Sequence, residues 1–100
     1  MEKVDISIKG SAKTEFYVKA LDFDECLEFH EKTTKDTDHN LKLVQMCLVD
    51  STGARVFKPQ QVKVIKDKIN GVDLMSVLMV ANAVNDFEKL GNIAEKYQKN

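Results

Sequence analysis

The sequence predicts a single α+β domain, with an N-terminal β-hairpin followed by about four α-helices packed as a small helical domain. The first segment alternates apolar and polar residues, which is typical of a half-buried strand. Later segments repeat apolar residues at spacings of three and four, which is typical of amphipathic helices. The chain has 100 residues, of which 43% are hydrophobic and 31% charged, and it contains no linker. We therefore expect residues 1–100 to share one core.

The hairpin is expected over residues 3–20. In its first strand, three apolar residues alternate with polar ones: Val4, Ile6 and Ile8. Its second strand places two apolar residues on one face: Phe16 and Val18. Residues 10–13 supply turn chemistry between the strands. Because a lone hairpin is barely stable in water, it must pack on the helices.

Two helices are predicted after the hairpin, over residues 22–33 and 38–49. Asp22 can cap the first helix and Glu25 can complete a capping box. Asp38 can cap the second. The run from residue 41 to 49 also fits a strand, but we favour a helix because no glycine or proline interrupts it and most of its residues are unbranched. The polar residues between the two helices are expected to form a loop.

The second half of the chain predicts helices over residues 59–69 and 72–90, with a tail over 92–100. Pro59 suits the first turn of a helix, where its missing N–H has no partner to lose. Upstream, Asp50 and Gly53 bound a turn. Whether the short extended run Ala54–Phe57 joins the hairpin sheet stays open.

The stretch from Val72 to Leu90 is the most apolar part of the chain. Polar residues interrupt it, and it is too short to cross a membrane. We expect one face of this helix to pack in the core through five residues: Leu74, Val77, Leu78, Ala81 and Val84. So small a domain has few elements to cover the rest, so we expect self-association and partner binding through this helix. The candidate partner-binding residues are Met75, Met79, Asn82, Leu78 and Phe87.

Composition and motifs disfavour several other functions. The net charge of −1 argues against nucleic-acid binding and against an anionic membrane surface. Cys26, His30, His39 and Cys47 have the residue types of a zinc site, but their spacing fits no known finger. Apolar neighbours of Cys47 predict a buried, unreactive thiol. We therefore expect no catalytic residue, metal or cofactor, while an enzyme or metal protein using Cys26, His30 and Cys47 stays a minor alternative.

The run from Leu41 to Phe57 resembles the phage tail assembly chaperone family. In that family, a helix rich in Leu, Val and Cys leads into a Val-Asp-x-x-Gly-x-x-x-Phe turn, which here is Val49-Asp50, Gly53 and Phe57. The strand with its following acidic helix, and the apolar helix containing Asn82 and Asn85, also fit the family. Lys58-Pro59-Gln60-Gln61 departs from it, since the family often has Thr or Ser with an acidic residue there.

The resemblance implies a non-enzymatic chaperone of virion morphogenesis. Such proteins self-associate, bind the tape-measure protein and tail-tube subunits, and are absent from the mature virion. Many occur in two lengths through a frameshift, and this chain would be the short form. The first residues, Met-Glu-Lys-Val-Asp, lack the apolar run of a signal peptide, which predicts the host cytoplasm. The alternative is a small regulatory protein-binding module from a mobile element.

Overall fold

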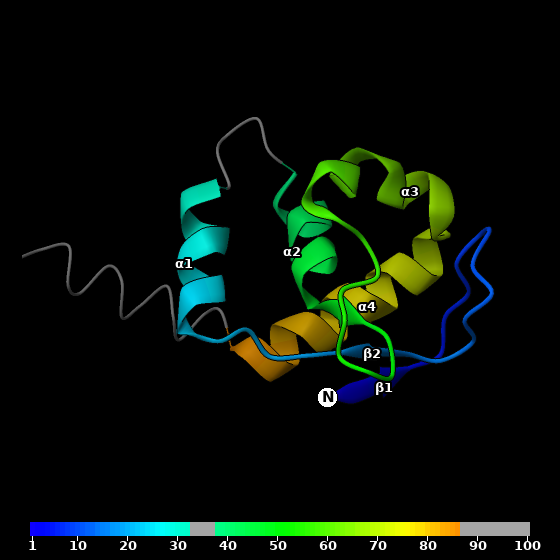
Figure 1. Ribbon diagram of the computed structural model, residues 1–100, viewed down its shortest axis with the longest axis horizontal. Helices are drawn as coiled ribbons and strands as arrows, with labels where there is room; N and C mark the ends of the chain where they lie inside the picture. The colour runs from blue at the N-terminus through cyan, green and yellow to red at the C-terminus, as the bar shows by residue number, and fades with distance from the viewer. Residues whose placement is uncertain (33–37, 87–100) are drawn as a thin grey trace, which may run out of the picture.

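A computed structural model describes residues 1–32 and 38–86, whereas residues 33–37 and 87–100 lie outside the description (Figure 1). The predicted α+β fold is confirmed, with a small antiparallel sheet and several helices. The strands are β1 (Glu2–Val4), β2 (Phe16–Val18) and β3 (Leu48–Val49). The helices are α1 (Phe23–Lys32), α2 (His39–Cys47), the 3-10 helix η1 (Pro59–Val64), α3 (Ile65–Lys68) and α4 (Gly71–Asn85).

The sheet has the strand order β1-β2-β3, with β2 in the centre. Val4 lies opposite Phe16 in the first pair, and Val18 lies opposite Leu48 in the second. All four of these side chains are buried. The run Ala54–Phe57 joins the sheet only through a single antiparallel bridge, between Val49 and Arg55, and does not form a strand of its own.

The N-terminal hairpin is shorter than predicted. Its strands pair only at 2–4 and 16–18, while residues 5–15 leave the ladder. Ile6 is nevertheless buried and Ile8 packs against the core, because this segment lies along the helices instead. The Lys9 amide donates to the Lys68 carbonyl at the end of α3. The alternating pattern therefore identified the buried face of this segment correctly. The prediction that residues 5–9 pair with the second strand of the hairpin was wrong, because Ser7 and Lys9 bond to helices instead.

The predicted helix over 38–49 ends two residues early. Asp38 caps it as expected, its carboxylate accepting from the Leu41 amide at 3.1 Å. Leu48 and Val49 then turn into an extended conformation and pair with β2. These two residues are apolar and suit either structure, so the tertiary contact with the central strand decides between them.

The predicted helix over 59–69 is divided into η1 and α3. In a 3-10 helix, side chains three residues apart lie above one another. Val62 and Ile65 therefore both face the core. The last helix ends at Asn85, where Asp86 adopts a left-handed conformation with φ of 50°. Its predicted extension through 87–90 and the predicted tail over 92–100 lie outside the described residues.

The core forms where α4 contacts α2 on one side and the strands β1 and β2 on another (Figure 1). Its fully buried side chains include residues of β2, α2, α3 and α4: Phe16, Val44, Ile65 and Val77. The helix α1 lies at one end of the molecule, against α2. This arrangement leaves one long face of α4 without a neighbour among the described elements.

Candidate protein-binding surface

The helix α4 begins and ends at defined polar residues. The Asn70 side chain accepts from the Asp73 amide at 2.9 Å, which satisfies one of the free amides of the first turn. At the other end, the Asp86 amide donates to the Asn82 carbonyl, and the left-handed backbone of Asp86 stops the helix. The helix therefore has a fixed length and presents a fixed outer face.

The inner face of α4 carries most of the predicted core residues. Val77 and Ala81 are fully buried, and Leu78 is 8% exposed. Leu74, Val80 and Val84 are half-buried and pack against the same cluster. Burial of a large aliphatic side chain contributes about 1.5–3 kcal/mol, so this face is enough to hold the helix in place. The outer face is not needed for that purpose.

The outer face of α4 is apolar and open to solvent. Val72 is 81% exposed, Met75 59% and Met79 70%. The three residues are spaced by three and four, so they form one continuous stripe. Together with Gly71 and Ser76 they line a shallow open hollow. We call Val72, Met75 and Met79 the methionine face.

No charge interrupts the methionine face. The only charged residue between Gly71 and Asn85 is Asp73, and its carboxylate is turned towards the N-terminal segment. It accepts from the Ser7 amide at 3.0 Å and from the Asn70 side chain at 3.2 Å. A solvated helix normally carries charged residues on its outer face. Exposed apolar patches are a feature by which candidate interaction surfaces are recognised, so we take this stripe as the candidate surface.

The five predicted partner-binding residues differ in exposure: three are exposed, one is buried and one lies outside the described residues. Met75 and Met79 are exposed, and so is Asn82, whose side chain donates to the Leu78 carbonyl at 2.8 Å. Leu78, which is predicted both as a core residue and as a partner-binding residue, is 8% exposed and lies in the core. Phe87 lies outside the described residues. The sequence analysis missed Val72, although it lies three residues before Met75 and so belongs to the same helix face.

The cysteines lie in environments that make them poor nucleophiles. Cys47 is fully buried, and burial raises the pKa of its thiol to about 12, although a hydrogen bond from Asn85 opposes this shift. Cys26 is half-buried, and burial also raises its pKa. Residues 1–32 and 38–86 contain no group of three or more His, Cys, Asp or Glu side chains that could hold a metal ion.

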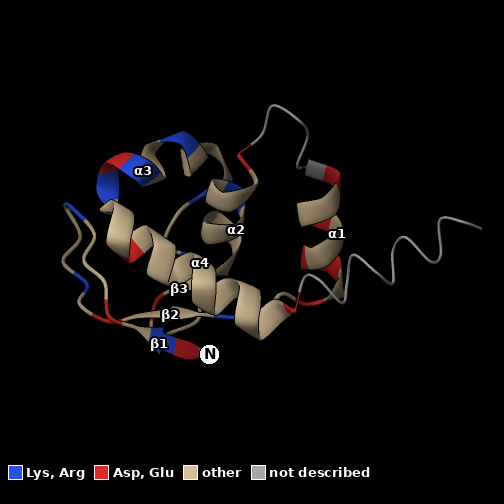
Figure 2. Cartoon of the chain, turned by 180° about the vertical axis from the view of Figure 1, so that it is seen from behind, with Lys and Arg blue, Asp and Glu red and all other residues tan. Residues whose placement is uncertain are grey.

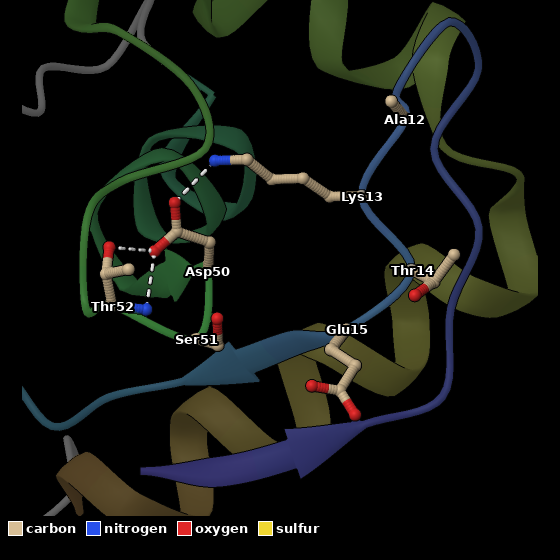
Figure 3. A pocket seen from close by; sticks show the side chains of 7 residues that line it. All are labelled: Ala12, Lys13, Thr14, Glu15, Asp50, Ser51 and Thr52. Atoms are coloured by element: carbon tan, nitrogen blue, oxygen red, sulfur yellow. Dashed lines mark hydrogen bonds and ion pairs between the residues drawn. The ribbon is translucent and has the colours of Figure 1, made fainter.

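The turn after β3 forms a polar hollow of about 300 Å³, shown in Figure 3. The Asp50 carboxylate accepts from Lys13 on one oxygen and from Thr52 and the Ala54 amide on the other. The hydrogen bond from Lys13, with those from Thr52, holds the pKa of Asp50 well below its usual range. Both oxygens are occupied, so Asp50 closes the turn and ties it to the loop of residues 5–15.

A second charged cluster attaches α1. The Glu25 carboxylate accepts from Lys19 at 2.7 Å and from Arg55 at 2.9 Å. Burial raises the pKa of Glu25, but the hydrogen bonds from Lys19 and Arg55 outweigh this effect and lower it from 4.5 to about 2. The Leu21 amide adds a hydrogen bond to Asn85 at 2.6 Å. The inner face of α1 is therefore fixed against β2, the turn after β3 and the end of α4.

No helix within residues 1–32 and 38–86 has the length and apolar content needed to cross a membrane. Comparison with known proteins finds no match: no family model, no curated protein and no solved structure resembles this chain closely enough to report. We therefore infer the function from the surface itself.

Proposed function

We propose that this chain is a non-enzymatic phage tail assembly chaperone. It binds the tape-measure protein and tail-tube subunits through the methionine face of α4, and it also self-associates. It acts in the host cytoplasm during virion morphogenesis and does not remain in the mature virion. The observation that carries the proposal is the exposure of Val72, Met75 and Met79 on a helix face without charge.

The methionine face has the chemistry of a surface that accepts more than one partner. Methionine is unbranched and polarizable, so Met75 and Met79 can adjust to different apolar surfaces. Each of the three side chains would contribute about 1.5–3 kcal/mol when a partner covers it. Part of this gain is offset by the entropy lost on association, so we expect micromolar rather than nanomolar binding. Reversible binding suits a chaperone that must leave the finished tail.

The turn that carries the family resemblance has a mainly structural role. Asp50 closes it, Gly53 adopts a φ of 87° that favours glycine, and Phe57 is 6% exposed in the core. These roles would be useful in any protein with this fold. The proposal therefore depends on the methionine face, and the resemblance supplies the class of partner.

The proposal is tested by introducing charge into the methionine face. The Met75→Asp, Met79→Asp double variant should lose capture of its phage's tape-measure protein when the two are co-expressed, because two carboxylates would have to be desolvated on binding. Its stability should stay close to that of the wild type, since both side chains are already exposed. Co-purification and thermal unfolding measure the two effects.

A matched control introduces the same two charges elsewhere. Ala12 and Thr14 are exposed loop residues, so an Ala12→Asp, Thr14→Asp variant should capture the tape-measure protein as well as the wild type. Undiminished capture by the variant with both methionines replaced would overturn the proposal. A wild-type chain that ignores tail proteins and instead retains a repressor or a host enzyme would favour the mobile-element regulator.

A further inference from the structure

The outer face of α1 combines acidic and apolar side chains. Phe23 is 75% exposed and Leu27 42% exposed, and they lie four residues apart on one face. Asp24 and Glu31 lie beside them and are exposed as well. We call Phe23, Asp24, Leu27 and Glu31 the acidic ridge. An exposed phenylalanine next to exposed carboxylates is suited to a partner surface that is both basic and apolar.

The attachment of α1 keeps the acidic ridge on the outside. Glu25, on the opposite face of the helix, is held by Lys19 and Arg55, and Glu28 lies 3.5 Å from the same arginine. Phe29 packs against the core from this inner side. Rotating the helix to hide Phe23 would break these contacts, so no rearrangement of α1 within residues 1–32 and 38–86 buries the ridge without losing them.

A basic surface lies on η1 and α3. Four exposed lysines share this segment with Val64, whose side chain is 40% exposed: Lys58 just before η1, Lys63 within it, and Lys66 and Lys68 in α3. Asp67 is the one exposed acid within this segment. We call Val64 and the four lysines the lysine surface. It combines an exposed apolar side chain with positive charges, so its composition is complementary to that of the acidic ridge.

The two surfaces lie at different ends of the molecule, as the colouring of Figure 2 shows. Within the described residues, Asp24 and Glu31 form no ion pair, and neither do Lys63 and Lys66. The net charge of the whole chain is only −1, so these charges are separated in space rather than in excess. Such a distribution attracts a second copy in one orientation and repels it in others.

We propose that the acidic ridge of one copy docks on the lysine surface of a second copy. The two surfaces differ, so the contact is heterologous and leaves one free surface of each kind at the ends of every pair. Assembly then continues until it closes into a ring or forms an open chain. This inference deepens the self-association in the proposed function, and it leaves the methionine face free for a protein partner.

Charge reversal tests the contact. A Lys63→Glu, Lys66→Glu variant and an Asp24→Lys, Glu31→Lys variant should each sediment as a monomer, because in each the two surfaces carry the same sign. An equimolar mixture of the two variants should recover the wild-type sedimentation profile, since each surface again meets its opposite. Association of the wild type should also weaken at about 1 M salt, where charges are screened within about 3 Å.

A neutral variant shows whether loss of association in the charge-reversed variants comes from unfolding of α1. Leu27→Ser removes apolar area from the ridge without changing its charge, and it should weaken association several-fold while the far-UV circular dichroism spectrum stays unchanged. A wild-type chain that remains monomeric at about 1 mM overturns the inference. So does undiminished association of either charge-reversed variant, or a mixture that stays monomeric.

The test of self-association is independent of the test of partner binding by the methionine face of α4. The Met75→Asp, Met79→Asp variant should still self-associate, because neither residue belongs to the two surfaces. Both charge-reversed variants should still capture the tape-measure protein, so loss of one property without the other shows which proposal has failed.

Discussion

Two apolar segments of this chain, Leu41–Asp50 and α4, have opposite environments. All residues from Leu41 to Asp50 are buried, including the polar side chains of Lys42, Gln45 and Asp50. In contrast, α4 contains a single charged residue, yet it leaves Val72, Met75 and Met79 largely exposed to water. The segment with more charged residues is therefore the better covered one.

The difference follows from position in the fold. The segment from Leu41 contacts α1, η1, α4 and β2, so it has neighbours all around it. Its polar groups have partners inside: Lys42 donates to Gln45 at 2.9 Å, and Gln45 donates to the Phe57 carbonyl at 3.2 Å. Buried polar groups are tolerated when they are bonded in this way. The number of neighbours, rather than hydrophobicity, decides which helix is enclosed.

The sharpest test of this contrast compares the same substitution in the two segments. Met46 is fully buried and Met79 is 70% exposed. Met46→Ala should lower the free energy of unfolding by about 2–5 kcal/mol, because it removes buried apolar contacts and leaves a cavity. Met79→Ala should change it by less than about 0.5 kcal/mol. Chemical denaturation measures both, and equal losses would show that the outer face of α4 is covered after all.

The buried polar group of the central segment should be the next most sensitive. Gln45→Ala removes the hydrogen bond accepted by the Phe57 carbonyl and leaves that buried oxygen without this donor. We expect a loss of about 1–3 kcal/mol. Gln60→Ala, at an exposed position on η1, should leave stability unchanged. If both variants unfold alike, the hydrogen bond to Phe57 has no role in holding the central segment.

The smallest effect should come from the attachment of α1 and should depend on pH. Since the folded-state pKa of Glu25 is lowered from 4.5 to about 2, its ionised form stabilises the fold above pH 4.5, and this contribution disappears as the pH falls towards 2. Glu25→Gln should therefore lower stability by about 1 kcal/mol at neutral pH, after allowance for solvent screening. The difference between the two proteins should shrink steadily below pH 4.5. A constant difference would exclude Glu25 as the titrating group.

Local sequence signals predicted the fold wherever a single residue determines the local structure. Asp38 and Asn70 both cap helices because their side chains reach amides only a few residues away. The end of α2 could not be predicted in this way. Leu48 leaves the helix because Val18, thirty residues earlier, offers a place in the sheet. Residues 5–9 likewise follow the strand pattern but bond to α3 and α4, which lie about sixty residues away along the chain.

The candidate surface was partly predictable for a related reason. Helical spacing places Met75 and Met79 on one face and Val77 and Ala81 on another, so the sequence alone separates these two pairs. It cannot show which face is covered, and Leu78 was assigned to a partner for that reason. The acidic ridge and the lysine surface were not predicted as binding surfaces, because each segment resembles an ordinary solvated helix face. Their complementarity is visible only when both are placed in space.

The bonds from Ser7 and Lys9 to Asp73 and Lys68 also constrain how the protein matures. A chain growing on the ribosome displays Ile6 and Phe16 early, whereas α4, which packs on β1 and β2, is synthesised after all the other described elements. Until then, the nascent N-terminal half has no complete core to collapse into. We expect this protein to acquire its native state only after α4 has left the ribosome, in one late cooperative step.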